Sequence, residues 1–202
     1  PPGRLALGRR GVESFQVSTE TTEGLVELAR SQHTTVSTVL QAGWAQVLMM
    51  MTGQPDVVFG TAVSGRPADV AGADSMMGML LNTVPVRARA TALSTVADLL
   101  SQVQRDHNDT FEHEHLALAE IQHLVGHEQL FDTLFVYENY PIDTAALLGQ
   151  HDLAVVDFTA WERNHYPLTV AASPGEGLAV RAEFDADVFD TTDIVTLMQS
   201  LR

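Results

Sequence analysis

The sequence predicts an α/β fold in which helices pack against a mixed β-sheet. Three observations support this prediction. Segments with helical spacing of apolar residues alternate with short strand-like runs, and the end of the chain is richer in such runs than its beginning. Residues 57–63 form a nearly continuous β-forming run, which is typical of a strand covered on both faces. Residues 83–89 alternate polar with apolar side chains, as a half-buried strand does.

The chain is expected to begin with a linker, because residues 1–11 are rich in Pro, Gly and Arg. Residues 12–202 are then expected to form one domain, since a chain of this length can bury a sizeable core. The first expected element of that domain is a strand over residues 12–17, where the side chains alternate in polarity.

Two helices are expected next, each preceded by residues whose side chains can cap it. Ser18 or Thr19 can cap the first helix, and Thr34 or Thr35 can cap the second. The run Thr52-Gly53-Gln54-Pro55 is expected to end the second helix, because Gly and Pro interrupt helical backbone.

The central stretch of the chain, residues 57–87, is predicted to form two strands joined by a loop that contains Arg66. Gly65 permits backbone angles that are closed to other residues, and Pro67 biases Arg66 toward extended geometry. Pro85 lies within the second strand and has no N–H to donate to a sheet. The second strand is therefore expected at an edge of the sheet or at a bulge.

Two further helices are expected over residues 93–112 and 116–125, with Ser94 as the cap of the first. A final helix is expected to open at Asp190. The remaining strand-like runs are residues 130–140, 154–161, 166–172 and 178–184.

Composition narrows the possible functions. The chain is 45% hydrophobic and 18% charged, as in ordinary globular domains, and it contains no apolar stretch long enough to span a bilayer. A net charge of -15 argues against binding to nucleic acid or to an anionic membrane. The absence of cysteine excludes disulfides, thiol catalysis and thiolate metal sites. No charged-then-apolar leader begins the sequence, and a cytoplasmic location is expected.

Several familiar site patterns are incomplete in this sequence. His123 and His127 have helical spacing, but Leu124 stands where a zinc protease carries its Glu, so no metal site is expected. The aspartates from Asp185 to Asp193 lack the turn glycine and the closing Glu of a calcium loop. Ser64 is not a nucleophile elbow, because Ala62 replaces the required glycine.

The central stretch resembles the C-terminal lobe of a nonribosomal peptide synthetase condensation domain. The family motif Gly-x-Phe-(Val/Ile)-Asn-Thr-x-x-x-Arg is similar to residues 78–87, with Leu80 in place of the usual Phe. The strand and floor loop that precede the motif are similar to residues 57–67. Further segments match the family in the same order: Leu118-Ala119-Glu120-Ile121-Gln122, Leu130-Phe131-Asp132-Thr133-Leu134 and Tyr137-Glu138-Asn139-Tyr140-Pro141.

The resemblance implies a fold and an activity. Condensation domains resemble chloramphenicol acetyltransferase, with two α/β lobes that form a V and a tunnel where the lobes meet. They form amide bonds between an acyl or peptidyl thioester and an aminoacyl thioester, each held by the phosphopantetheine arm of a carrier protein. Catalysis depends on a His-His-x-x-x-Asp-Gly motif, whose second His positions or deprotonates the nucleophile, a role that suits an imidazole near neutral pH.

That histidine motif is absent from the sequence, and the family carries it on the N-terminal lobe. The chain is therefore expected to be one lobe, residues 12–202, that is inactive by itself and binds no cofactor directly. The partners implied by the resemblance are the N-terminal lobe, carrier proteins and a neighbouring adenylation domain. A lone lobe is also expected to self-associate through the face that its partner lobe would cover.

The resemblance also implies candidate site residues. Ser64, Gly65 and Arg66 belong to the loop that floors the cleft. The family motif near the tunnel contributes Gly78, Asn82, Thr83 and Arg87. From residue chemistry alone, Arg66, Asn82 and Arg87 have plain structural interpretations: an ion pair, a strand-end hydrogen bond and a solvent-facing charge. The resemblance favours a cleft role for Arg66 and Asn82, whereas Arg87 is taken as structural.

Three other functions remain open. A condensation-like domain without chemistry could serve as a docking platform for carrier proteins or tailoring enzymes. An epimerisation domain shares the fold and the double His. An acyltransferase of the same superfamily would act on thioesters without a carrier. The state of the double-His motif upstream distinguishes a synthetic domain from a docking one.

Overall fold

The computed structural model describes residues 9–65, 70, 72, 76–78, 80–139, 164–175 and 177–202. The expected strand over residues 154–161 and most of the expected linker lie outside these ranges. The strands are β1 (Arg10–Val17), β2 (Asp56–Val63), β3 (Asn82–Arg89), β4 (Thr133–Tyr137), β5 (Leu168–Pro174) and β6 (Leu178–Asp185). The helices are α1 (Thr19–Ser31), α2 (Val36–Thr52), α3 (Val96–Thr110), the 3₁₀ turn η2 (Phe111–His113), α4 (Leu118–Val125) and α6 (Thr191–Leu201).

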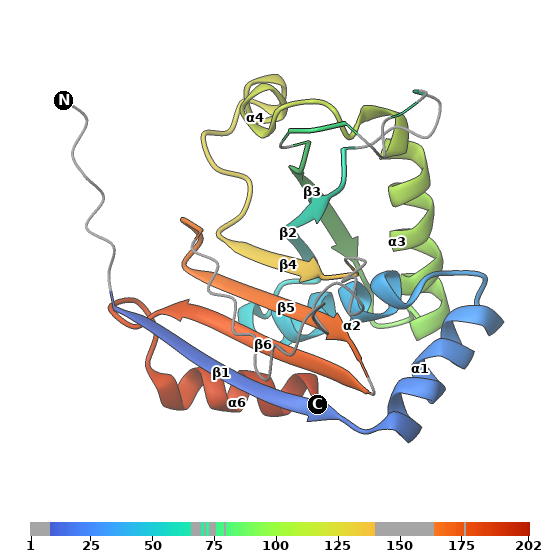
Figure 1. The fold of residues 1–202 in the computed structure, drawn as a ribbon, viewed down its shortest axis with the longest axis vertical. Coiled ribbons are helices and arrows are strands. Elements are labelled where there is room, and N and C mark those ends of the chain that lie inside the picture. The colour runs from blue at the N-terminus through green and yellow to red at the C-terminus, as the bar shows by residue number, and fades with distance from the viewer. Residues whose placement is uncertain are drawn as a thin grey trace, which may run out of the picture.

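The described strands form one mixed sheet in the order β1-β6-β5-β4-β2-β3. Strands β2, β4 and β5 run parallel to one another, whereas β3, β6 and β1 pair antiparallel with their neighbours. Figure 1 views this sheet from the face opposite α2 and α6. The expected α/β fold with a mixed sheet and packed helices is confirmed.

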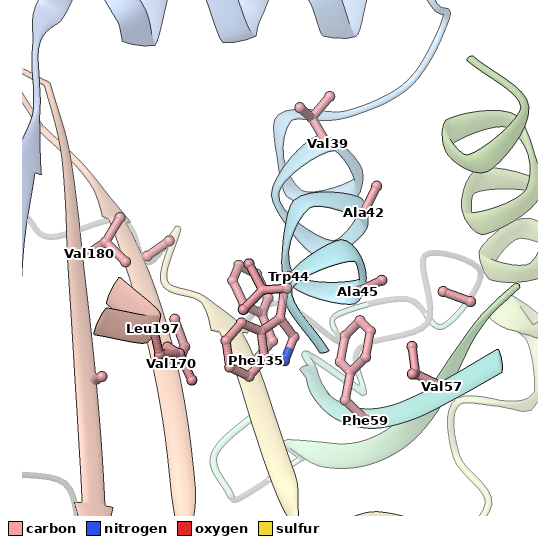
Figure 2. Packing of buried hydrophobic residues seen from close by; sticks show 14 of the residues in the cluster. Val39, Ala42, Trp44, Ala45, Val57, Phe59, Phe135, Val170, Val180 and Leu197 are labelled. Atoms are coloured by element: carbon pink, nitrogen blue, oxygen red, sulfur yellow. The ribbon is translucent and has the colours of Figure 1, made fainter. Parts of the chain in front are cut away.

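The main core lies between the sheet and helices α2, α3 and α6. Strand β6 shows how the sequence builds it: alternate residues from Leu178 to Phe184 are buried and the residues between them are partly exposed. Trp44 from α2 and Phe135 from β4 are among the most deeply buried side chains of this core. Figure 2 shows these two side chains in the layer between the helix and the strands.

A second, smaller apolar cluster lies on the other face of the sheet. Phe131, Leu134 and Tyr166 form its centre, and Leu118 at the start of α4 packs against it. Helix α4 therefore covers part of the sheet face that α2 and α6 leave open. The rest of that face carries the candidate site.

Local expectations about helix caps are mostly confirmed, with one correction. The side chains of Ser18 and Thr35 accept the capping hydrogen bonds of α1 and α2. Helix α3 is capped by Thr95, and Ser94 was the wrong choice. The hydroxyl of Ser94 instead accepts a hydrogen bond from the backbone N–H of Thr91 in the preceding turn, which leaves Thr95 to form a capping box with Asp98.

Pro85 lies in β3, which is the last strand of the described sheet order. The expectation that this strand lies at an edge is therefore confirmed, and the missing N–H of proline removes no central ladder bond. Among the described residues, no helix is long and apolar enough to cross a membrane.

Candidate functional site

In the described part of the chain, the sheet face opposite α2 and α6 contains a hollow of about 250 Å³. Its floor consists of small or aliphatic side chains from β2, β4 and β5, and its walls are polar. The apolar lining residues are Ala62, Leu81, Leu134, Val136 and Ala171. The polar lining residues are Asn82, Thr83, Glu138, Asn164, Thr169, Arg181 and Glu183.

Three charged side chains form an ionic group along one wall of the hollow. Arg181 Nη2 lies 3.2 Å from Glu183 Oε1 and 3.6 Å from Glu138 Oε1. The hydroxyl of Ser173 donates a hydrogen bond of 2.5 Å to Glu138 Oε2. All three charged side chains are largely buried, so the Coulomb attraction between them is less screened than the attraction between exposed side chains. The group joins β6 to the ends of β4 and β5.

Asn164, which lies just before β5, forms part of a second wall of the hollow. Its Nδ2 donates to Thr169 Oγ1 at 2.9 Å, and its Oδ1 accepts from the backbone N–H of Tyr166 at 3.0 Å. Arg10 of β1 donates to the carbonyl oxygens of Asn164 and Tyr166. These bonds hold the entry to β5 in one conformation.

The first two residues of β3 form the wall opposite the ionic group. Asn82 Nδ2 donates to the carbonyl oxygens of Glu114 and Leu116, each at 2.7 Å. Asn82 Oδ1 accepts from the backbone N–H of Thr83 at 2.9 Å. The Asn82 side chain thus links β3 to the connection between η2 and α4.

Thr83 also lines the hollow and is linked to Tyr166 of the second apolar cluster. Burial raises the pKa of the Tyr166 hydroxyl, and a side-chain hydrogen bond with Thr83 acts in the lowering direction. Tyr166 also stacks on Phe131, with 5.6 Å between ring centroids. Tyr166 therefore stays a neutral hydrogen-bonding group over the ordinary pH range.

Two of the floor-loop candidates, Ser64 and Gly65, directly follow β2 at the start of the segment that joins β2 to β3. Ser64 is exposed at the end of β2, and Gly65 has a φ of +58°. Gly65 therefore adopts the left-handed backbone that its sequence context led us to expect. Arg66 lies outside the described residues. Gly78 is exposed, with a φ of +142°.

The family-motif candidates separate into two places. Asn82 and Thr83 both line the hollow. Arg87 lies further along β3, where its Nε and Nη2 donate to the two carboxylate oxygens of Asp56 at 2.9 and 2.6 Å. Both side chains of this pair are substantially exposed. The position of Arg87 fits its interpretation as a structural residue.

Sequence reasoning did not select the ionic group of the hollow. In the sequence, Arg181 and Glu183 are only the polar positions of the strand-like run over residues 178–184, and Glu138 is only part of a segment that matches the family. Their alternation did indicate that both point away from the core. Their contact with Glu138 depends on the pairing of β4, β5 and β6, for which the local sequence offers no signal.

Sequence comparison supports the same family as the motifs. The profile described as "Condensation domain" matches residues 9–202. The chain is 35% identical over 189 residues to one of the subunits of linear gramicidin synthase from Brevibacillus parabrevis, covering 92% of this chain and 4% of that protein. It is 42% identical over 175 residues to chondramide synthase cmdD of Chondromyces crocatus, covering 85% of this chain and 4% of that protein. The chain thus spans a small part of these relatives' length.

Solved structures show the same fold. A four-domain nonribosomal peptide synthetase bound to AMP and glycine superposes with a TM-score of 0.83 at 19% identity, covering 96% of this chain and 16% of that chain. The first condensation domain of the calcium-dependent antibiotic synthetase gives 0.74 at 22%, covering 96% and 44%. The X-domain in complex with OxyB from teicoplanin biosynthesis gives 0.78 at 20%, covering 98% and 46%.

Proposed function

The chain belongs to the condensation-domain family, and on that premise we propose that it is the C-terminal lobe of an amide-forming domain in a nonribosomal peptide synthetase. The observation that carries the proposal is the family match over residues 9–202. The matched condensation-domain structure is covered to 44%, which is the share expected for one of two lobes. The order of the family motifs along the sequence supports the assignment to the C-terminal lobe.

In the proposed reaction, the amine of an aminoacyl thioester attacks the carbonyl carbon of an acyl or peptidyl thioester. A C–N bond forms, the C–S bond breaks, and the carrier thiol leaves as the amine loses a proton. The base is the second His of the double-His motif on the N-terminal lobe. The substrates arrive on phosphopantetheine arms of carrier proteins, and an adenylation domain loads them. This chain supplies one wall of the cleft.

Within that wall, Ser64, Gly65 and Arg66 form the floor of the cleft, and Gly78, Asn82 and Thr83 lie near the tunnel. The location of Asn82 and Thr83 at the hollow supports this arrangement. Arg87 stabilises the edge strand through Asp56. The open sheet face beside the hollow is where the partner lobe packs, and without that lobe it drives self-association of the chain.

An amide-forming assay with loaded carrier proteins tests the proposal. The chain alone is expected to give no product, and the two-lobe domain that contains it is expected to give the amide. A matched control is the two-lobe domain with the second His of the motif replaced by Ala. Amide formation by the chain alone would overturn the proposal.

The likeness to the X-domain that was solved with OxyB supports a second candidate, a docking platform without chemistry. In that case the double-His motif upstream would be degraded, and the two-lobe domain would bind a carrier protein or tailoring enzyme without forming an amide. An epimerase would instead racemise the α-carbon of the bound acyl group. The same assay, read by chiral analysis of the bound residue, separates these outcomes.

A further inference from the structure

Both N–H donors of the Asn82 amide are used inside the protein. An asparagine side chain has two N–H donors and a carbonyl oxygen that can accept two hydrogen bonds. In Asn82 the amide nitrogen donates to the carbonyl oxygens of Glu114 and Leu116, and the amide oxygen accepts from the backbone N–H of Thr83. We propose that Asn82 is a positioning residue, which holds α4 and the β3 wall of the hollow in place and does not itself bind substrate. This inference rests on the proposed function.

The connection that Asn82 holds has weak local support. Helix α4 has only 8 residues, which is too short to be stable by itself in water. Ala117 precedes it, and in the described part of the chain no side chain caps the helix there. The carbonyl groups of Glu114 and Leu116 lie in the turn just before it, and a part-buried carbonyl without a donor costs free energy. Asn82 satisfies both carbonyls at once.

The neighbouring residue, Thr83, connects β3 to the second apolar cluster. Thr83 hydrogen-bonds Tyr166, and Tyr166 stacks on Phe131 in the second apolar cluster. Leu118, the first residue of α4, packs against the same cluster. The start of β3, the start of α4 and the second cluster are therefore each in contact with the other two. Loss of the Asn82 hydrogen bonds is expected to move the β3 wall of the hollow together with α4.

The substitution Asn82→Asp tests the positioning role with almost no change in size. It removes both N–H donors and places a carboxylate beside two carbonyl oxygens. Asn108→Asp is the matched control: Asn108 is exposed on α3, and its Oδ1 accepts from Gln104 Nε2, which an aspartate oxygen also does. Hydrogen exchange on the chain is expected to be about tenfold faster over residues 114–125 in Asn82→Asp. The control is expected to exchange like the wild type.

The second arm measures amide formation by the complete synthetase that carries each substitution, at a temperature where circular dichroism shows a folded protein. Asn82→Asp is expected to raise the KM for the loaded carrier protein about threefold or more, with a smaller change in kcat, because the wall is displaced in the ground state. Unchanged exchange over residues 114–125 would overturn the positioning role. Faster exchange with unchanged KM and kcat would also overturn the positioning role, since Asn82 would then be only structural.

The two proposals fail in different ways. If the wild-type synthetase forms no amide, the proposed function fails and a positioning role in amide formation fails with it. Faster exchange in Asn82→Asp would still support the link between β3 and α4 in that case. If amide formation is normal in the wild type and lost in Asn82→Asp without any change in exchange, Asn82 contacts substrate and the inference is wrong.

Discussion

The backbone at Gly65 lies against the carbonyl group of Leu80. A methyl group added at Gly65 would overlap the carbonyl oxygen of Leu80, and Gly65 also has a φ of +58°. Two residues from opposite ends of the connection between β2 and β3 thus meet at its base. Glycine is required there for two independent reasons, the close backbone approach and the left-handed conformation.

Gly65→Ala is therefore expected to lower the free energy of unfolding by about 3 kcal/mol, because the backbone has to shift as well as accept strain. Gly53→Ala is the matched control: its φ is +65°, but no described atom lies within 4 Å of the added methyl group. The control is expected to cost about 1 kcal/mol, the strain alone. Urea denaturation measures both variants, and equal losses would contradict the role of the Leu80 contact.

Gly24→Ala is expected to stabilise the protein. Gly24 lies inside α1 at an exposed position, and no described atom lies within 4 Å of the added methyl group. Alanine loses less backbone entropy than glycine when a helix forms, so the expected gain is about 1 kcal/mol. Gly43→Ala in α2 likewise meets no described atom and provides a second test. A loss of stability in both variants would show that the helices are packed differently from this structure.

Thr95→Ala is expected to cost about 1 kcal/mol, because it removes the side-chain oxygen that caps α3. Ser94→Ala is the control, since Ser94 only supports the preceding turn through Thr91. The thermal midpoint should fall further for Thr95→Ala than for Ser94→Ala. The reverse order would restore Ser94 as the cap.

The stabilisation by Asp56 is expected to depend on pH. Side-chain hydrogen bonds from Arg87 lower the pKa of the Asp56 carboxyl below its ordinary value of about 3.9. The folded state therefore releases this proton more readily than the unfolded state. The stabilising contribution is fully present above the ordinary pKa and is lost as the pH falls below it through the lowered pKa.

Urea midpoints of the wild type and Asp56→Asn should accordingly differ slightly near neutral pH and converge in acid. The difference should be small and should shrink with added salt, because both side chains of the pair are exposed. Asp109→Asn, at another exposed position, is the matched control. A difference that stays constant down to the acid unfolding transition would rule out the pair with Arg87 as its source.

The sequence alone determined the local features of this protein, because each of them depends on a few neighbouring residues. Helical and alternating periodicities located the main elements, Ser18 and Thr35 were among the expected caps, and Pro85 indicated an edge strand. The ordered motifs indicated the family. The predicted cap of α3 was wrong. Ser94 and Thr95 both carry a hydroxyl that can cap a helix, but the hydroxyl of Ser94 is hydrogen-bonded to Thr91 in the preceding turn.

Only the tertiary structure decided how the wall of the hollow is built. Asn82 meets the carbonyl groups of Glu114 and Leu116 because β3 lies at the sheet edge beside α4. Arg181 meets Glu138 because β4, β5 and β6 are consecutive in the sheet. Strand order and register are set by packing over the whole core, so residues far apart in the sequence carry no local sign that they will touch.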